Sequence, residues 1–341
     1  MFTIDNVNGI RLDGYELAVF DQAQPLPLVV QPAPGASPDL MALTAQKAVL
    51  EKLLVRHGAI LFRGFDVPAV HTFNDFISSL SSDPIFYSER SSPRHSVYKN
   101  IYTSTDYPED KEIIQHSEQS YNKSFPRKIF FYCETPPRKG GATPLADARK
   151  IYKRIPAPIV SAFEENHYRY SRCFWQTIGT TWQSAFQTNQ KDKVEEYCLA
   201  NDIHFEWHPG GVLKSYQIRR TTAYHPVSGE ACWFNHCMFF NVLSLDEEIR
   251  QVLQFSFEPH ELPNQTFYGD GREIPPEVIR ELQRAYEDER TEFDWEKGDI
   301  LMIDNILVTH GRRSFKGERS ILCGMSEITH WSDVAQKLDQ S

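Results

Sequence analysis

The sequence lacks paired-cysteine motifs and any excess of positive charge. Its six cysteines are scattered without a C-x-x-C pair, so their spacing indicates neither a disulfide framework nor a zinc ribbon. Lysine and arginine number 36 against 46 aspartates and glutamates, a formal net charge of -10, which leaves no basic excess for neutralising phosphates. We therefore expect reduced thiols in a cytoplasmic protein, with a small molecule or a protein as partner and no nucleic acid.

Long apolar runs and a leader segment are also missing. The N-terminal stretch MFTIDNVNGIRLDGYEL has neither a basic nor an apolar region of the signal-peptide kind, and no apolar run reaches the roughly 20 residues that cross a bilayer. No repeat of fixed period appears, and no linker separates two cores. We expect residues 1–341 to form one soluble domain without membrane contact.

What is present is a globular composition, with 40% hydrophobic and 13% aromatic residues. Helical spacing covers residues 40–57 and 71–80, and a strand is expected at 59–65. From residue 113 onward strand-like segments dominate, notably 216–226, 231–243, 299–310 and 319–328. The pattern predicts a mainly β domain with flanking helices (α+β), with helical inserts at about 148–200 and 245–292.

The segment IIQHSEQSY places His116 and Glu118 two positions apart. Side chains on a strand alternate faces, so both would point the same way, with Cα atoms about 6.6 Å apart. An imidazole nitrogen and a carboxylate oxygen each bind a divalent metal at about 2.0–2.2 Å, and His310, at the end of the apolar segment 299–310, is the candidate third ligand. On its own H-x-E is short enough to occur by chance, which would leave an ordinary strand histidine beside a glutamate.

A second segment, HFEWHP, offers His204, Glu206 and His208 in the same alternation. Spacing alone does not rank the two sites, but a fixed cation for an acidic cosubstrate is found only near His310. Arg319 follows nine residues later and starts a predicted strand. An arginine binds a carboxylate bidentately and keeps its charge when desolvated. The alternatives are a plain polar strand at 204–208, and Arg312 or Arg313 as the cation.

Longer motifs carry a resemblance over most of the chain: GAILFRGF, QHSEQSYNKSFPRKIFFYCETPPRKGGATPLADARKIY, HPVSGEACWFNH and WEKGDILMIDNILVTHGRRSFKGERSILCGM. In this order they resemble the Fe(II)/2-oxoglutarate-dependent oxygenases of the taurine dioxygenase (TauD/TfdA) and clavaminate synthase type. Within that superfamily they are most similar to the branch around the syringomycin aspartyl hydroxylase (SyrP-like).

The resemblance implies a double-stranded β-helix, or jelly roll, in which His116, Glu118 and His310 hold Fe(II). Arg319 would pair with the distal carboxylate of 2-oxoglutarate, and Thr143 of GGATP would hydrogen-bond the same cosubstrate; without the resemblance, Thr143 would be a turn residue after two glycines. The implied reaction uses O2, converts 2-oxoglutarate to succinate and carbon dioxide, and hydroxylates an unactivated C–H bond. Glu118 replaces the aspartate of most relatives, as in the clavaminate synthase branch, and a carboxylate there argues against halogenation.

The resemblance also implies a substrate class, an amino acid or its derivative in specialised metabolism, either free or bound to a peptidyl carrier protein. Candidate partners for a charged substrate are Arg219 and Arg220 in YQIRRTTAYHP and Asn235 and His236 in CWFNH. A solvated strand edge and satisfied core groups are the alternatives, because sheet register cannot be read from one sequence.

Two rival functions remain at this point. One is a jelly-roll metal enzyme that does not use 2-oxoglutarate, against which Arg319 and Thr143 argue. The other is a non-catalytic binding protein on the same fold, against which the full set of ligands argues.

Overall fold

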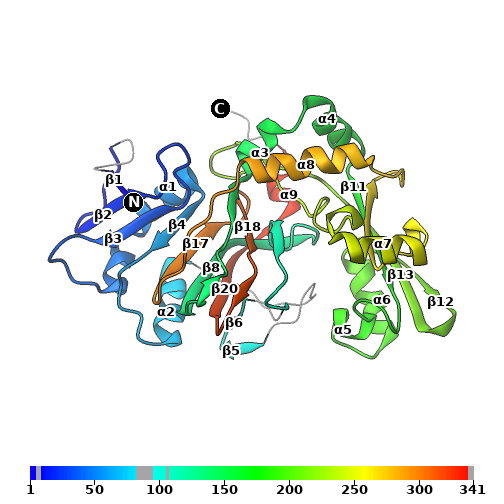
Figure 1. Cartoon of the computed structure of the whole chain (residues 1–341), viewed down its shortest axis with the longest axis horizontal. Helices are drawn as coiled ribbons and strands as arrows, with labels where there is room; N and C mark the ends of the chain where they lie inside the picture. Colours follow the sequence, from blue (N-terminus) through cyan, green and yellow to red (C-terminus); the bar gives the residue numbers. More distant parts are fainter. Residues whose placement is uncertain (5–8, 82–94, 105–106, 337–341) are drawn as a thin grey trace.

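The largest layer is a nine-stranded sheet on one side of the molecule (Figure 1). The computed structural model describes residues 1–4, 9–81, 95–104 and 107–336. Neighbouring strands are antiparallel except β3 and β4, which are parallel. In spatial order the strands are β1 (Phe2–Ile4), β2 (Tyr15–Val19), β3 (Leu28–Pro32), β4 (Ala59–Phe62), β17 (Ile300–Asp304), β8 (Ser124–Thr135), β20 (Ser320–His330), β6 (Ile101–Thr103) and β5 (Ser96–Tyr98).

A three-stranded sheet shares its hydrophobic core with the large sheet. Its order is β10 (Leu145–Asp147), β18 (Val308–Arg312) and β7 (Ile113–His116), all antiparallel. Strand β8 shows how the core is divided, because Phe131 belongs to the cluster that includes Val308 of β18, whereas Phe130 and Tyr132 belong to the cluster beneath α1 and α2. This alternation is the period of two expected of a strand buried on both faces.

A four-stranded sheet forms the other side of the molecule, together with α5, α6 and α7 (Figure 1). Its order is β12 (His204–His208), β13 (Val212–Arg219), β11 (Tyr168–Phe174) and β16 (Asn264–Tyr268). Strands β11 and β16 lie inside the segments 148–200 and 245–292, which the sequence predicted to be helical inserts. The prediction was incomplete there, because both strands are short and their partners come from distant parts of the chain. Two further two-stranded ladders pair β14 (Thr222–Tyr224) with β15 (Ala231–Trp233), and β9 (Lys139–Gly140) with β19 (Phe315–Lys316).

Helices pack outside the sheets. The segment 40–57 forms a 3-10 helix, η1 (Leu40–Gln46), followed by α1, which ends at Gly58 with φ of +79°. A side chain at Gly58 would also collide with Val308, so both conformation and space require glycine. The α-helices are α1 (Lys47–His57), α2 (Val70–Leu80), α3 (Ala148–Arg154), α4 (Ala157–Asn166), α5 (Trp182–Phe186), α6 (Lys191–Ala200), α7 (Glu247–Ser256), α8 (Pro276–Asp288) and α9 (Trp331–Val334); η2 (Pro209–Gly211), η3 (Val242–Ser244) and η4 (Pro259–Glu261) are short 3-10 turns.

Three predicted strands were wrong in extent. The segment 216–226 is the end of β13 and the short β14, separated at residues 220–221. The segment 299–310 is two strands, β17 and β18, separated by a turn in which the Leu307 amide donates to the Asp304 carbonyl. The segment 231–243 is a strand only as far as Trp233, and then turns through Asn235. The prediction of a mainly β chain with flanking helices is confirmed.

Within the described part of the chain, no helix combines the length and the apolarity needed to span a membrane. All six cysteines lie in the described part of the chain, where they are buried and form no disulfide.

Candidate metal centre

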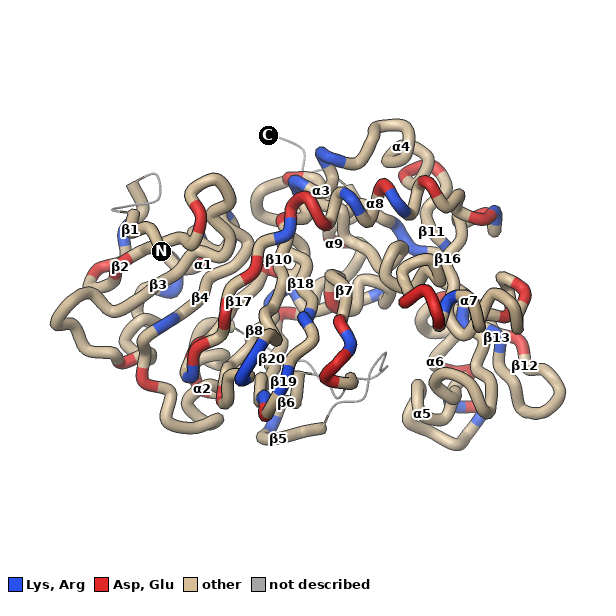
Figure 2. Tube along the Cα trace, in the orientation of Figure 1, with Lys and Arg blue, Asp and Glu red and all other residues tan. Residues whose placement is uncertain are grey.

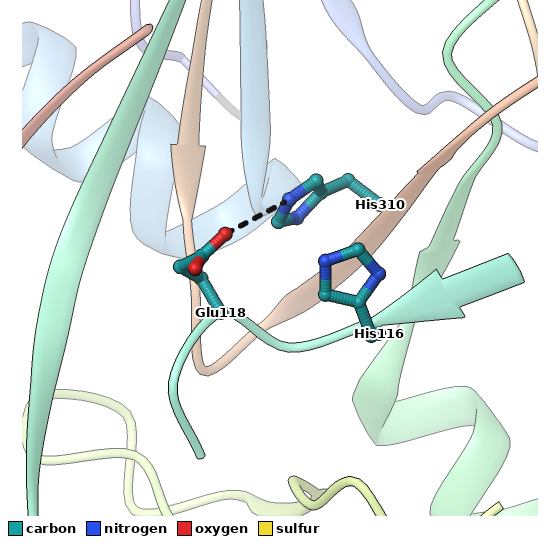
Figure 3. Close-up of side chains that lie close together, drawn as sticks. All are labelled: His116, Glu118 and His310. Carbon is teal, nitrogen blue, oxygen red and sulfur yellow. Dashed lines mark ion pairs between the residues drawn. The ribbon is translucent and has the colours of Figure 1, made fainter. Parts of the chain in front are cut away.

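Three potential metal ligands meet where β7 and β18 pair. His116 lies directly opposite His310, and Glu118 follows two residues after His116 (Figure 3). One donor atom from each lies within 4.8 Å of the other two, and His310 Nε2 is 3.8 Å from a Glu118 carboxylate oxygen. Two ligands that each lie about 2.1 Å from one ion are at most about 4.2 Å apart. A small inward movement of the side chains therefore suffices to bring all three onto one divalent ion.

The backbone sets the orientation of the His116 ring. His116 Nδ1 lies 2.9 Å from the Ile114 carbonyl oxygen. Because a carbonyl only accepts, Nδ1 carries the proton and Nε2 keeps its lone pair for a metal.

The sequence pattern predicted Glu118 on the same strand as His116, and this prediction was wrong. Strand β7 ends at His116, and Glu118 lies in the turn that follows. Asn305 holds this turn, since its Oδ1 accepts the Glu118 amide at 2.7 Å and its Nδ2 donates to the Glu118 carbonyl at 2.9 Å. The sequence did not lead us to predict a role for Asn305. The only sequence signal of that role is the Asp304-Asn305 pair at the end of an apolar strand.

Aromatic rings enclose the cluster. His116 contacts Phe239 at 4.8 Å between ring centroids, and His310 contacts Phe131 at 5.2 Å. Glu118 and His310 are only 4% and 5% exposed. The low exposure matters because a metal-bound reactive group is protected from bulk water in such a site.

His236 is the predicted substrate residue that contacts this cluster. Its ring centroid lies 5.5 Å from that of His116, and its Nδ1 is 2.6 Å from Ser120 Oγ. Burial, and then the charge of His116, lower the pKa of His236 well below its ordinary value. His236 is therefore neutral at pH 7, with its orientation fixed by Ser120.

The other three predicted substrate residues have different surroundings. The Arg219 guanidinium donates to the carbonyls of Tyr121 at 2.9 Å and Asn201 at 2.7 Å. Arg220 is exposed. The Asn235 amide donates to the Thr221 carbonyl and its Oδ1 accepts the Cys237 amide. The surroundings of Arg219 and Asn235 match the alternative of satisfied core groups, and those of Arg220 match the alternative of a solvated position. The substrate role of all three stays a prediction.

Arg319 lies immediately before β20 and makes fewer hydrogen bonds than the other two candidate cations. Its Nε is buried without a hydrogen-bond partner among the described residues, and its Nη2 makes one long bond of 3.4 Å to the Gly141 carbonyl. Burial, and then the charge of Arg312, lower the pKa of Arg319 to about 10, so it stays charged at pH 7. A largely desolvated guanidinium with a single long hydrogen bond is suited to an anionic ligand.

Arg312 and Arg313 are already engaged. The Arg312 guanidinium donates to the carbonyls of residues 107, 108 and 111 at 2.5–2.8 Å. Arg313 pairs with Glu112 and Glu292, both at 2.9 Å.

Thr143 is buried in the segment that runs beside β18. Its Oγ1 accepts the indole N–H of Trp295 at 3.0 Å. Because an indole N–H only donates, the Thr143 hydroxyl proton is directed to another acceptor.

The competing segment at 204–208 forms β12, an edge strand of the four-stranded sheet. His204 stacks on Tyr216 with centroids 4.4 Å apart, and His208 Nε2 is 3.5 Å from the Glu206 carboxylate. Among the described residues, the His/Cys/Asp/Glu donor atoms that gather within reach of one ion are those of the β7–β18 cluster. The contacts of His204, Glu206 and His208 are therefore those of the alternative interpretation, a plain polar strand.

Comparison with known proteins identifies the family. The model of the family described as "Taurine catabolism dioxygenase TauD, TfdA family" matches residues 22–326. The chain is 39% identical over 272 residues to the dapdiamide synthesis protein DdaC of Enterobacter agglomerans, covering 80% of this chain and 83% of that protein. It is 29% identical over 323 residues to a clavaminate synthase-like protein of Arabidopsis thaliana, covering 89% and 94%.

The fold is similar to that of PvcB of Pseudomonas aeruginosa, whose structure is described as an "Fe, alpha-ketoglutarate dependent oxygenase from an isonitrile synthetic pathway". The TM-score is 0.53 at 12% identity, with 94% of each chain covered, and this supports the predicted jelly roll. The donor set of two histidines and one carboxylate is the one that non-haem Fe(II) oxygenases use. The chain therefore belongs to the TauD/TfdA family and is an Fe(II)/2-oxoglutarate-dependent dioxygenase.

Proposed function

We propose that His116, Glu118 and His310 hold the Fe(II), that Arg319 and Thr143 hold 2-oxoglutarate, and that the enzyme hydroxylates a C–H bond of an amino acid or an amino-acid derivative. The observation that carries the assignment is the meeting of two histidines and one carboxylate in a buried site. Arg319 supports the position of the cosubstrate, because its buried Nε has no hydrogen-bond partner among the described residues.

The bound iron, with 2-oxoglutarate and O2, supplies the oxidising chemistry, and the protein supplies position and shielding. Ile114 fixes the tautomer of His116, and Asn305 fixes the turn that carries Glu118. The rings of Phe131 and Phe239 keep bulk water from the cluster. These residues orient the metal ligands or shield the cluster, and none of them takes part in the reaction itself.

Arg319 and Thr143 have complementary tasks in this proposal. The guanidinium offers a fixed positive fork to the distal carboxylate of 2-oxoglutarate. The Thr143 hydroxyl accepts from Trp295, and so can donate its own proton to the same cosubstrate.

The substrate class rests on the resemblance to the aspartyl-hydroxylase branch and on the likeness to a protein of dapdiamide synthesis. Both support an amino-acid-like substrate, free or bound to a carrier protein, in specialised metabolism. Within the site, the neutral imidazole of His236 is the best-placed polar group for orienting it. We further propose a cytoplasmic location, which six described cysteines without a disulfide support.

The test is succinate release from 2-oxoglutarate across free amino acids, aminoacylated carrier proteins, sulfonates and aryloxy acids. Mass spectrometry would follow the gain of one oxygen by each compound. We expect coupled turnover with an amino-acid substrate in one of its two forms, and its loss in His116→Ala, Glu118→Ala and His310→Ala. Efficient turnover of a sulfonate or an aryloxy acid, with no amino-acid form active, would overturn the substrate class and leave the iron chemistry standing.

A further inference from the structure

A cavity of about 250 Å³ lies between β7, α8 and the turn at 238–244, and no residue of the metal cluster lines it. Its apolar wall is formed by Ile113, Ile114, Pro144 and Met238. Figure 2 shows β7 beside β18 near the middle of the molecule, with charged residues at its start. The cavity is thus a second recess, distinct from the catalytic site.

One polar group on the cavity wall lacks a partner. Gln115 is only 7% exposed, and its Nε2 has no hydrogen-bond partner among the described residues. By contrast, Gln283 and Ser244 on the same wall bond each other at 3.3 Å. Buried polar groups normally have partners, so Gln115 indicates a polar ligand group beside it in the cavity.

Two ion pairs stand on the cavity wall. Arg290 is 2.6 Å from the Glu287 carboxylate, and Arg313 is 2.9 Å from that of Glu112. The side chains of Glu112 and Glu287 are 48% and 59% exposed, so this part of the cavity is open to solvent. Arg313 is held by Glu292 as well as by Glu112, so Arg290 is the better donor for a ligand carboxylate, while the exposed Glu112 and Glu287 suit an ammonium group.

We propose that this cavity binds a free α-amino acid with an apolar side chain, at a site separate from the metal centre. Its carboxylate would accept from Gln115 and Arg290, and its ammonium group would face the two glutamates. The apolar side chain would pack on Ile114, Pro144 and Met238. The site stands on its own residues, and does not depend on the proposed substrate of the enzyme.

Calorimetric titration of the full, metal-free chain with L-leucine tests the site. We expect one leucine per chain, and binding weaker by about tenfold or more in Gln115→Leu and in Arg290→Gln. 4-Methylpentanoate, which lacks the ammonium group, and 3-methylbutylamine, which lacks the carboxylate, should each bind more weakly than leucine.

The matched control is Arg284→Gln, because Arg284 is an exposed arginine of α8 paired with Glu281 at 3.0 Å. It should bind leucine like the wild type, and so should His310→Ala, which alters the metal cluster. No binding by the wild type, equal binding in Gln115→Leu and Arg290→Gln, or loss of binding in His310→Ala would each overturn the proposal. If Gln115→Leu fails to fold, Arg290→Gln on the solvent side decides alone.

Discussion

Three arginines lie between the end of β18 and the start of β20, and their hydrogen bonds distinguish them. Arg312 donates to three backbone carbonyls and Arg313 pairs with two carboxylates, whereas Arg319 makes one long hydrogen bond within the described part of the chain. The Nε atoms of Arg312 and Arg319 are both buried without a described partner. A largely desolvated cation with few partners is unfavourable unless a ligand completes its hydrogen bonds. We therefore expect 2-oxoglutarate to complete those of Arg319.

Arg319→Ala should raise the 2-oxoglutarate concentration needed for half-maximal turnover by about tenfold to a hundredfold. The reason is that a hydrogen bond to a charged group contributes about 1.5–3 kcal/mol. Succinate formation at varied 2-oxoglutarate measures it. Arg313→Ala is the matched control, and a larger effect there than in Arg319→Ala would move the anchor.

Asn305 acts through the backbone of Glu118. Asn305→Ala removes both hydrogen bonds to the Glu118 peptide groups, so the carboxylate loses its fixed direction. Fe(II) affinity should fall about 10- to 100-fold, as is usual when the support of a metal ligand is removed. Anaerobic Fe(II) titration measures this affinity. The control is Asn166→Ala, which removes an asparagine at the end of α4 that bonds the Ala162 carbonyl. Unchanged affinity would show that Glu118 is held by other contacts.

At the scale of elements, the metal cluster depends on the pairing of β18 with β7. Gly311 follows His310, and a Cβ there would lie 2.5 Å from the Ile113 carbonyl oxygen and 3.2 Å from the Gln115 amide nitrogen. Backbone on both sides cannot move aside easily. Glycine at 311 thus lets the two strands approach closely enough to bring His116 opposite His310.

Gly311→Ala should therefore weaken Fe(II) binding and lower the free energy of unfolding by about 1–3 kcal/mol, the usual cost of overpacking. Gly324→Ala in β20 is the control, because its Cβ would meet only the side-chain ends of Ile77 and Ile101. Chemical denaturation and Fe(II) titration of both variants separate the two effects. If Gly311→Ala binds iron normally, close strand approach is not what the cluster needs.

Some of the helices and strands were predictable from the sequence, and others were not. Periodicity predicted the helical segments that contain α1, α2, α7 and α8, helped by boundary residues such as Gly58 after α1 and the prolines at the start of α8. It joined β17 and β18 into one strand, since the turn between them is as apolar as the strands. It missed β11 and β16, whose pairing is set by residues almost a hundred positions apart.

At the scale of the whole molecule, the half-buried His57 links stability to pH. His57 Nδ1 lies 3.1 Å from the Pro25 carbonyl oxygen and so carries the proton, while Nε2 is buried without a partner in the described chain. Burial is the main reason that the pKa of His57 lies below its ordinary 6.5. Below pH 6.5 the unfolded state takes up a proton that the folded state refuses, so stability falls as the pH falls.

His57→Gln should consequently lose less stability between pH 7 and pH 5 than the wild type does. Urea unfolding at both pH values measures the difference. His71→Gln, at an exposed position of α2, should keep the wild-type pH dependence. An unchanged pH dependence in His57→Gln would mean that other groups account for it.

The site was predictable from sequence in part, for physical reasons. Residue types and motif order identified His116, Glu118 and His310, which the fold brings together across β7 and β18. Asn305 binds the Glu118 peptide 187 residues away, and Arg219 binds the Tyr121 carbonyl 98 residues away. One sequence does not display such tertiary contacts. That residues 1–341 form one domain stays a prediction, which limited proteolysis would test.

The most direct test of the central claim is an anomalous-difference map at the iron absorption edge. It would come from crystals grown anaerobically with Fe(II) and 2-oxoglutarate. The account predicts one iron peak per chain, within about 2.0–2.2 Å of the Glu118 carboxylate and of one ring nitrogen each of His116 and His310. An iron peak on His204 and His208 of β12, or none at the β7–β18 pair, would contradict it.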